Sequence, residues 1–273
     1  MIKTFPDSVP AWCPGCGNYA ILKTFDEAVE EAGVDRTRLV LVSGIGQAAK
    51  LPHYTKANVF NGLHGRALPA ATGIKMANHE LEVVITSGDG DMYGEGGNHF
   101  LHALRRNIGV KAFVHNNKVY GLTKGQASPT SDFGFTTKIQ KHGVILQPLN
   151  PLALAIVEDC SFVARTFSGD MEHMKEMMIS ALRHKGGFAL LDILHPCVSF
   201  NRVNTFQWYQ ERVKRIDESH DPFNRDAALQ LALKGEDEIP IGIIYRSNRP
   251  GFESRQPILA GGTLCGQYGK RVT

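Results

Sequence analysis

The stretch GDGDMYGEGG, residues 88–97, gives the clearest indication of the fold. It follows the apolar run LEVVITS, which predicts a buried strand ending in a glycine-rich turn. It has neither the third glycine of the dinucleotide fingerprint nor the Lys-Ser/Thr of a P-loop. Carboxylates at Asp89 and Asp91 would repel a phosphate, unless Mg²⁺ binds between them. The alternative is a tight turn whose aspartates cap the next helix.

A second stretch, VKAFVHNN at residues 110–117, predicts the next strand, with Asn116 and Asn117 at its end. Side-chain amide and backbone carbonyl oxygens are suitable ligands for a hard cation, although asparagines here are also common turn formers. Ligands of open parallel sheets bind beyond the carboxyl ends of the strands. Both polar stretches are therefore expected at one edge of a sheet.

The rest of the chain alternates between helical and strand patterns. This alternation predicts a doubly wound parallel α/β sheet. The predicted helices cover residues 18–33, the region beyond Pro69, and residues 97–107 and 171–187; the further strands cover 38–46 and 188–197. After about residue 200 the pattern weakens to one helix within 221–235 and an irregular Gly- and Pro-rich stretch, 244–273. We expect an α/β domain over residues 1–200 and a C-terminal extension over 201–273 that packs on a partner subunit.

Composition excludes several classes of protein. The chain has 273 residues, of which 42% are hydrophobic and 21% charged, with a net charge of +3. This charge gives no argument for a nucleic-acid partner. No apolar stretch reaches the roughly 18–20 residues that span a membrane, and no secretory signal is recognisable, so the cytoplasm is the expected location.

Five cysteines are an odd number, and two of them form the pair Cys13-x-x-Cys16 in WCPGCGN. A third, Cys197, follows a predicted strand in HPCVSF. In a reducing compartment such a pair indicates metal, cluster or redox chemistry rather than a disulfide. A Zn²⁺ site on the same residues is the plainer alternative. Cys160 is expected in a helix of the core, and Cys265 lies in the irregular stretch.

The sequence GDG, followed after 25 residues by NN, resembles the thiamine-diphosphate motif. The wider ordered set WCPGCGN, VSGIG, KLPHY, LHGRALPAATGIKMAN, NNKVYGLTKGQASPTS and HPCVSFN resembles the β subunit of 2-oxoacid:ferredoxin oxidoreductases, and the 2-oxoglutarate type best. The resemblance covers roughly residues 10–202 and implies a sheet of the thiamine-diphosphate-binding type. It also implies that Asp89, Asn117 and the Val119 carbonyl hold Mg²⁺ on the diphosphate.

The resemblance implies a reaction and its partners. The reaction is CoA-dependent oxidative decarboxylation of a 2-oxoacid, with 2-oxoglutarate expected, or the reverse reductive carboxylation used in carbon fixation. Electrons pass through a [4Fe–4S] cluster to ferredoxin, because such a cluster accepts them one at a time. An α subunit supplies the glutamate that thiamine's pyrimidine requires. The chain is thus expected to be inactive alone and to form a heterodimer or a dimer of heterodimers.

The resemblance also assigns individual residues. His64 is expected beside the diphosphate, and Lys50 and Leu122 in the substrate pocket; the plain readings are a structural histidine, a surface lysine and a buried leucine. Lys124 mildly supports a dicarboxylic substrate. The remaining positions expected to contact the cofactor are Gly44, Ile45, Gly46, Gln47, Gly88, Gly90, Asp91, Tyr120 and Thr123.

One position departs from the family pattern. Cys13, Cys16 and Cys197 match three cluster ligands, but Gln47 stands where the family has the fourth cysteine. Four readings follow: a non-cysteine or solvent-held iron, a three-iron cluster, a ligand from elsewhere, or loss of the cluster. A thiamine-dependent decarboxylase-like enzyme without a cluster is the alternative function, and a regulatory or structural paralogue is the non-enzymatic one.

Overall fold

An eight-stranded sheet in the order β2-β1-β3-β4-β8-β7-β10-β9 forms the centre of the protein. The structure is a computed structural model that describes residues 9–268. Neighbouring strands run parallel, except that β10 pairs antiparallel with β7. The strands are β1 (Leu39–Ser43), β2 (Asn58–Asn61), β3 (Glu82–Gly88), β4 (Val110–Asn116), β7 (Phe162–Phe167), β8 (Ala189–Leu194), β9 (Val213–Arg215) and β10 (Ile239–Arg246).

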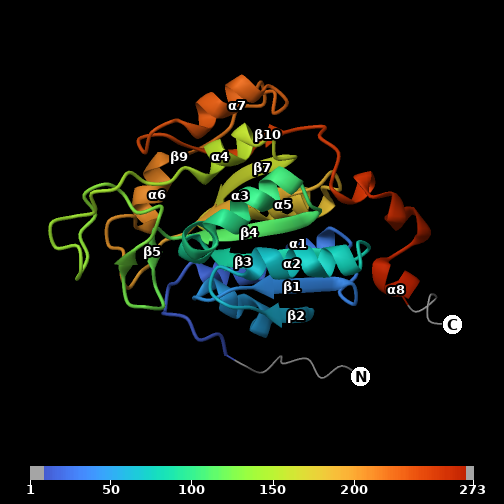
Figure 1. Cartoon of the computed structure of the whole chain (residues 1–273). Helices are drawn as coiled ribbons and strands as arrows, with labels where there is room; N and C mark the ends of the chain where they lie inside the picture. Colours follow the sequence, from blue (N-terminus) through green and yellow to red (C-terminus); the bar gives the residue numbers. More distant parts are fainter. Residues whose placement is uncertain (1–8, 269–273) are drawn as a thin grey trace.

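Helices cover both faces of this sheet (Figure 1). One apolar cluster joins the sheet to α1 (Asn18–Glu31) and α5 (Met171–Arg183). A second cluster joins the other face to α2 (Ala67–Ala77), α3 (Gly97–Arg106), α4 (Pro151–Val157) and α7 (Arg225–Ala232). Valine, leucine and alanine dominate the central strands because both of their faces are buried. The doubly wound sheet predicted from the sequence is confirmed.

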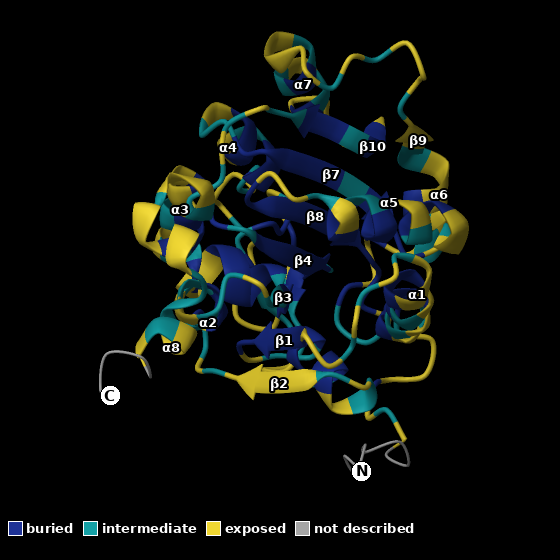
Figure 2. Cartoon of the chain, turned by 90° about the vertical axis from the view of Figure 1, so that its right-hand side faces the viewer, coloured by how far each residue is buried: buried dark blue, intermediate teal, exposed yellow. Residues whose placement is uncertain are grey.

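Burial falls off towards one edge of the sheet. All four residues of β2 are exposed, whereas every residue of β4 and β8 is buried (Figure 2). The carboxyl ends of the buried strands lie side by side, since Gly88 of β3 pairs with His115 of β4, which pairs with Ile193 of β8. The two polar stretches expected at one edge of the sheet are therefore adjacent.

Short elements connect the layers. A two-stranded hairpin, β5 (Val119–Tyr120) and β6 (Gln126–Ala127), follows β4. A π-helical turn, η2 (Gly90–Glu95), joins β3 to α3, and a 3-10 helix, η1 (Ala48–Tyr54), follows β1. The remaining elements are α6 (Phe206–Arg212), η3 (Glu253–Arg255), η4 (Pro257–Gly261) and α8 (Leu264–Tyr268).

The irregular C-terminal arm begins later than predicted. The sheet crosses the division expected at residue 200, and residues 244–246, predicted to be irregular, complete β10. Beyond β10 the chain packs on its own α3, where the Asn107 amide donates to the carbonyls of Arg249 (3.1 Å) and Pro250 (3.2 Å). The Glu253 carboxylate accepts the Gly109 N–H at 2.8 Å. These contacts anchor the first part of the arm.

Candidate functional site

A cavity opens at the carboxyl ends of β1, β3, β4 and β8. It brings together most of the residues expected to bind a cofactor. Its lining comprises Ile45, Gly46, Gln47, Ala48, His64, Gly88, Asp89, Gly90, Asp91, His115, Asn117, Val119, Tyr120, Gly121, Leu122, Thr123 and His195. Of the predicted positions, Gly44 and Lys50 are not in this lining.

The three residues expected to hold Mg²⁺ all line this cavity. The Asp89 carboxylate accepts hydrogen bonds from the Ser128 hydroxyl at 2.5 Å and the Thr130 hydroxyl at 2.6 Å. Burial nevertheless raises the pKa of Asp89 to about 6, and a nearby cation would favour its charged form. The Asn117 side-chain oxygen accepts the Val119 N–H at 3.0 Å, which orients the turn. This oxygen-rich set fits a hard divalent cation.

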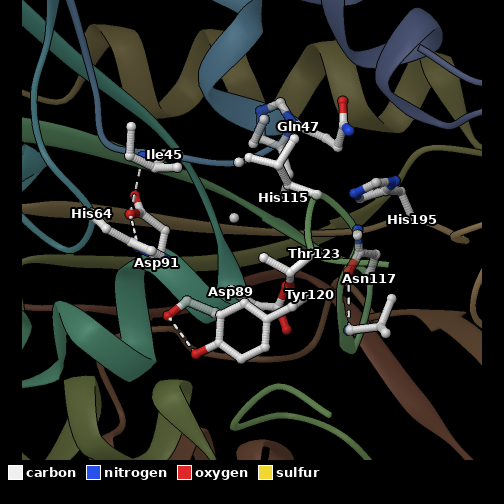
Figure 3. A pocket seen from close by; sticks show the side chains of 17 residues that line it. Ile45, Gln47, His64, Asp89, Asp91, His115, Asn117, Tyr120, Thr123 and His195 are labelled. Atoms are coloured by element: carbon white, nitrogen blue, oxygen red, sulfur yellow. Dashed lines mark hydrogen bonds and ion pairs between the residues drawn. The ribbon is translucent and has the colours of Figure 1, made fainter. Parts of the chain in front are cut away.

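Asp91 lines the same cavity, but its carboxylate joins neighbouring loops (Figure 3). It accepts the N–H groups of Ile45 (3.1 Å) and Gly65 (2.7 Å) and the Ser87 hydroxyl (2.6 Å). It also lies 2.7 Å from His64 Nδ1. Asp91 therefore fixes the positions of Ile45 and His64 at the cavity wall.

Two glycines permit close packing around this wall. A Cβ at Gly44 would lie 2.1 Å from Asp91 Oδ2, and one at Gly90 would lie 2.2 Å from the Tyr120 ring. Gly44 thus makes room for the Asp91 carboxylate rather than lining the cavity. Gly46 has a φ of +122°, which glycine adopts readily, and the chain turns there into η1.

The β5–β6 hairpin carries the predicted Tyr120, Leu122 and Thr123. Leu122 is 46% exposed at the cavity, which differs from the buried leucine of the plain reading. Lys50 is half-buried on η1, and its Nζ donates to the Ala11 carbonyl at 3.0 Å. Lys124 is exposed with a φ of +72°. The structure therefore places Leu122 at the cavity and turns Lys50 towards the N-terminal segment.

Four lining residues were not predicted from the sequence: Ala48, Gly121 and the two histidines His115 and His195. The two histidines are buried, and their rings lie 6.1 Å apart in an edge-to-face arrangement. Burial lowers the pKa of His115 well below its usual range and that of His195 to about 4. Each ends a predicted strand, which was the available signal, but a lone histidine usually fills a structural role.

A second pocket adjoins this cavity and contains three cysteines. Its lining comprises Trp12, Cys13, Cys16, Asn18, Gln47, Asn117, Gly121, Cys197, Val198, Ser199 and Phe200. Burial raises the pKa of the Cys16 thiol, and Cys197 and Cys13 contribute in the same direction because they are close. Gln47, Asn117 and Gly121 line both spaces and form a shared wall.

The other two cysteines lie elsewhere. Cys160 precedes β7 rather than lying in a helix, so that prediction was wrong, although its burial was correct. Its thiol donates to the Phe162 carbonyl at 3.4 Å. Cys265 is exposed on α8, which lies on the opposite side of the molecule from the β5–β6 hairpin (Figure 1).

Comparison with known proteins now identifies the family. The model for the C-terminal TPP-binding domain of thiamine pyrophosphate enzymes matches residues 43–193, and that for the C-terminal part of the pyruvate ferredoxin oxidoreductase β subunit matches residues 197–260. The chain is 45% identical over 249 residues to the 2-oxoacid:ferredoxin oxidoreductase subunit β of Saccharolobus solfataricus, covering 86% of this chain and 81% of the relative. The chain belongs to the family of 2-oxoacid:ferredoxin oxidoreductase β subunits.

Two further relatives support this assignment. The 2-oxoglutarate oxidoreductase subunit KorB of Mycobacterium tuberculosis is 44% identical over 235 residues, which cover 86% of this chain and 59% of the relative. A solved 2-oxoglutarate:ferredoxin oxidoreductase from Magnetococcus marinus, with 2-oxoglutarate, coenzyme A and succinyl-CoA bound, matches with a TM-score of 0.88 and 33% identity. That match covers 97% of this chain and 88% of the other. The protein is thus an oxidoreductase β subunit, which implies an α partner.

The described part of this β subunit lacks two further features. Within residues 9–268, no helix is long and apolar enough to cross a membrane. Over the same range, no three His, Cys, Asp or Glu side chains are grouped closely enough to hold one metal ion.

Proposed function

We propose that this β subunit and an α subunit together catalyse CoA-dependent oxidative decarboxylation of 2-oxoglutarate, or the reverse carboxylation. Electrons would pass through a [4Fe–4S] cluster to ferredoxin. One observation carries this proposal: the cavity with the magnesium-type ligands shares a wall with the three-cysteine pocket. The substrate and CoA are supported by the names of the relatives from Mycobacterium and Magnetococcus.

Asp89, Asn117 and Val119 would hold Mg²⁺ and, through it, the cofactor's diphosphate. When bound, thiamine diphosphate would supply a nucleophilic carbon for the 2-oxo group and a thiazolium ring able to take up the electron pair left by decarboxylation. Asp91 would hold His64 and the Ile45 loop in place around that diphosphate, because its carboxylate bonds to both. The exposed Leu122 would contact the substrate side of the cavity.

The α subunit would complete the site. The part of the chain that the structure describes contributes no glutamate to the cavity lining. Thiamine needs a glutamate at its pyrimidine, so we propose that α supplies it, within a heterodimer or a dimer of heterodimers. The proposal predicts that the isolated β subunit binds thiamine diphosphate with Mg²⁺ but does not turn over a 2-oxoacid.

A cluster-free thiamine-dependent decarboxylase is the second candidate, and Gln47 favours it. This residue lines the cysteine pocket but has no thiol to offer an iron. Cys13, Cys16 and Cys197 favour the first candidate, because a cluster-free enzyme has no use for three thiols that line one pocket. Ferredoxin reduction separates the two functions.

The test uses the β subunit co-expressed with its α subunit and purified without oxygen. Ferredoxin reduction should depend on 2-oxoglutarate, CoA, thiamine diphosphate and Mg²⁺ together, with pyruvate a poorer substrate. Asp89→Ala should abolish it, whereas Asp221→Ala, on the surface, should leave it unchanged. Release of CO₂ without ferredoxin reduction would support the cluster-free enzyme, and no reaction with any 2-oxoacid would refute both candidates.

A further inference from the structure

The three-cysteine pocket has one ligand too few for the cluster it is proposed to hold. A [4Fe–4S] cluster is normally held by four thiolates, one for each iron. Cys13, Cys16 and Cys197 supply three, and they converge on one pocket. The identity of the fourth ligand can be narrowed from the contacts around this pocket.

The two remaining thiols are excluded by their positions. Cys160 is fully buried before β7, where its thiol donates to the Phe162 carbonyl. Burial raises the pKa of Cys160 to about 12, which disfavours the thiolate that binds iron. Cys265 lies on exposed α8, away from the carboxyl ends of the strands. Neither thiol lines the three-cysteine pocket.

Two amide side chains in the pocket lining are already engaged. The Asn18 side-chain oxygen lies 2.7 Å from His115 Nδ1, and the Asn117 side-chain oxygen accepts the Val119 N–H. Asn117 also belongs to the proposed magnesium site. These contacts leave Gln47 as the remaining amide in the lining.

The Gln47 side chain carries an unused acceptor at this place. Its Oε1 atom is buried and has no hydrogen-bond partner among residues 9–268. Leaving such an oxygen unpaired is unfavourable, so a native protein usually provides a partner. The Gln47 carbonyl accepts the Trp12 indole N–H at 2.9 Å. Because Trp12 precedes Cys13, this bond holds Gln47 beside the cysteine pair.

We propose that the side-chain oxygen of Gln47 binds the fourth iron of the cluster. This inference rests on the proposed function, since it requires a cluster in this pocket. A neutral oxygen replaces a thiolate, so the site carries one negative charge fewer and its reduction potential should be more positive. Oxygen is also a harder and weaker ligand for this iron than sulfur. The fourth iron should therefore leave more easily than the other three.

The experiment compares four αβ complexes purified anaerobically: wild type, Gln47→Cys, Gln47→Ala and the thiol control Cys265→Ala. Iron retained by a Cys13→Ala/Cys16→Ala complex is subtracted as the contribution of other sites. Iron and sulfide are counted, loss of iron to a chelator is timed, and ⁵⁷Fe Mössbauer spectra are recorded. The potential of each cluster is measured by titration.

We expect wild type and Cys265→Ala to lose one iron in four at least about tenfold faster than the rest. That iron should have a distinct Mössbauer signal, which Gln47→Cys should lack. Gln47→Cys should also lose its irons slowly and together, at a more negative potential. Gln47→Ala should lose the fourth iron faster still, because only solvent would then hold it.

Two outcomes would overturn the inference and leave the proposed function standing. They are equal iron lability in wild type and Gln47→Ala, or four equivalent irons in wild type. A different outcome would refute the cluster itself, and the proposed function with it: no iron in wild type although it binds thiamine diphosphate, whether or not Gln47→Cys holds iron.

Discussion

Replacing Asp91 by alanine should destabilise the protein strongly. Its carboxylate accepts hydrogen bonds from Ile45, Gly65 and Ser87 and contacts His64. The bonds from Gly65 and Ser87 are buried, and each donor left without an acceptor costs about 1–3 kcal/mol. His64 is 39% exposed, so water can replace its partner. The bond from the Ile45 N–H is only partly buried, so its loss should contribute less. In total we expect the free energy of unfolding to fall by about 4 kcal/mol and the Tm by about 10 °C.

The assay is guanidinium unfolding of the full chain, followed by circular dichroism. Asp91→Asn keeps the shape and one acceptor oxygen but loses the charge, so about half of that cost is expected. Gly44→Ala leaves the Asp91 carboxylate charged but places a Cβ 2.1 Å from its Oδ2 atom. Because this Cβ would displace the carboxylate, Gly44→Ala should lower the free energy of unfolding by about as much as Asp91→Ala. A loss below about 1 kcal/mol in Asp91→Ala would show that these bonds do not hold the loops together.

Three further outcomes are expected. Asn201→Ala removes the 3.2 Å bond from its amide to the Asn117 carbonyl and should weaken Mg²⁺-dependent thiamine diphosphate binding about tenfold, measured by fluorescence titration. Gly65→Ala should lower the free energy of unfolding by about 3 kcal/mol, and the control Gly33→Ala by about 1 kcal/mol. Both have φ near +70°, but only the first would place a Cβ 2.4 Å from a backbone carbon. Burial lowers the pKa of Lys75 to about 8, so between pH 8 and 10 the unfolded chain binds more protons than the folded one. As the pH rises through this range, the free energy of unfolding of wild type should therefore increase relative to that of Lys75→Met, measured by urea titration.

The sequence predicted four strands of the central sheet but missed β7, which is also almost entirely buried. β1, β3, β4 and β8 are apolar runs, mostly of valine, leucine and alanine, that are followed by glycine or polar residues. The structure forms a buried strand at each of them. β2 was not predicted because all four of its residues are exposed at the sheet edge, which leaves no apolar pattern. β10 was not predicted because Pro240 and Gly242 interrupt its apolar run.

The proximity of the two polar stretches could be predicted from the sequence, because backbone motifs determine it. The two polar stretches end neighbouring strands, so their proximity followed from the order of the sheet. Side-chain direction was harder to predict, because it depends on local packing. Lys50 points to the Ala11 carbonyl through the turn of η1, and the role of Asp91 as a bridge between loops depends on contacts with distant residues.

The shared wall makes the two pockets interdependent. Gln47 and Asn117 line both, and Asn201 ties them further, because its amide donates to the Asn117 carbonyl while its N–H donates to the Cys197 carbonyl at 3.1 Å. A change in the cysteine pocket can therefore displace the residues proposed to bind magnesium without touching the cofactor. Activity alone would then confuse loss of an iron ligand with movement of Asn117. Iron lability in the Gln47 variants distinguishes these two effects. Movement of Asn117 changes the affinity for the cofactor, whereas loss of the Gln47 amide oxygen changes the rate at which one iron in four is released.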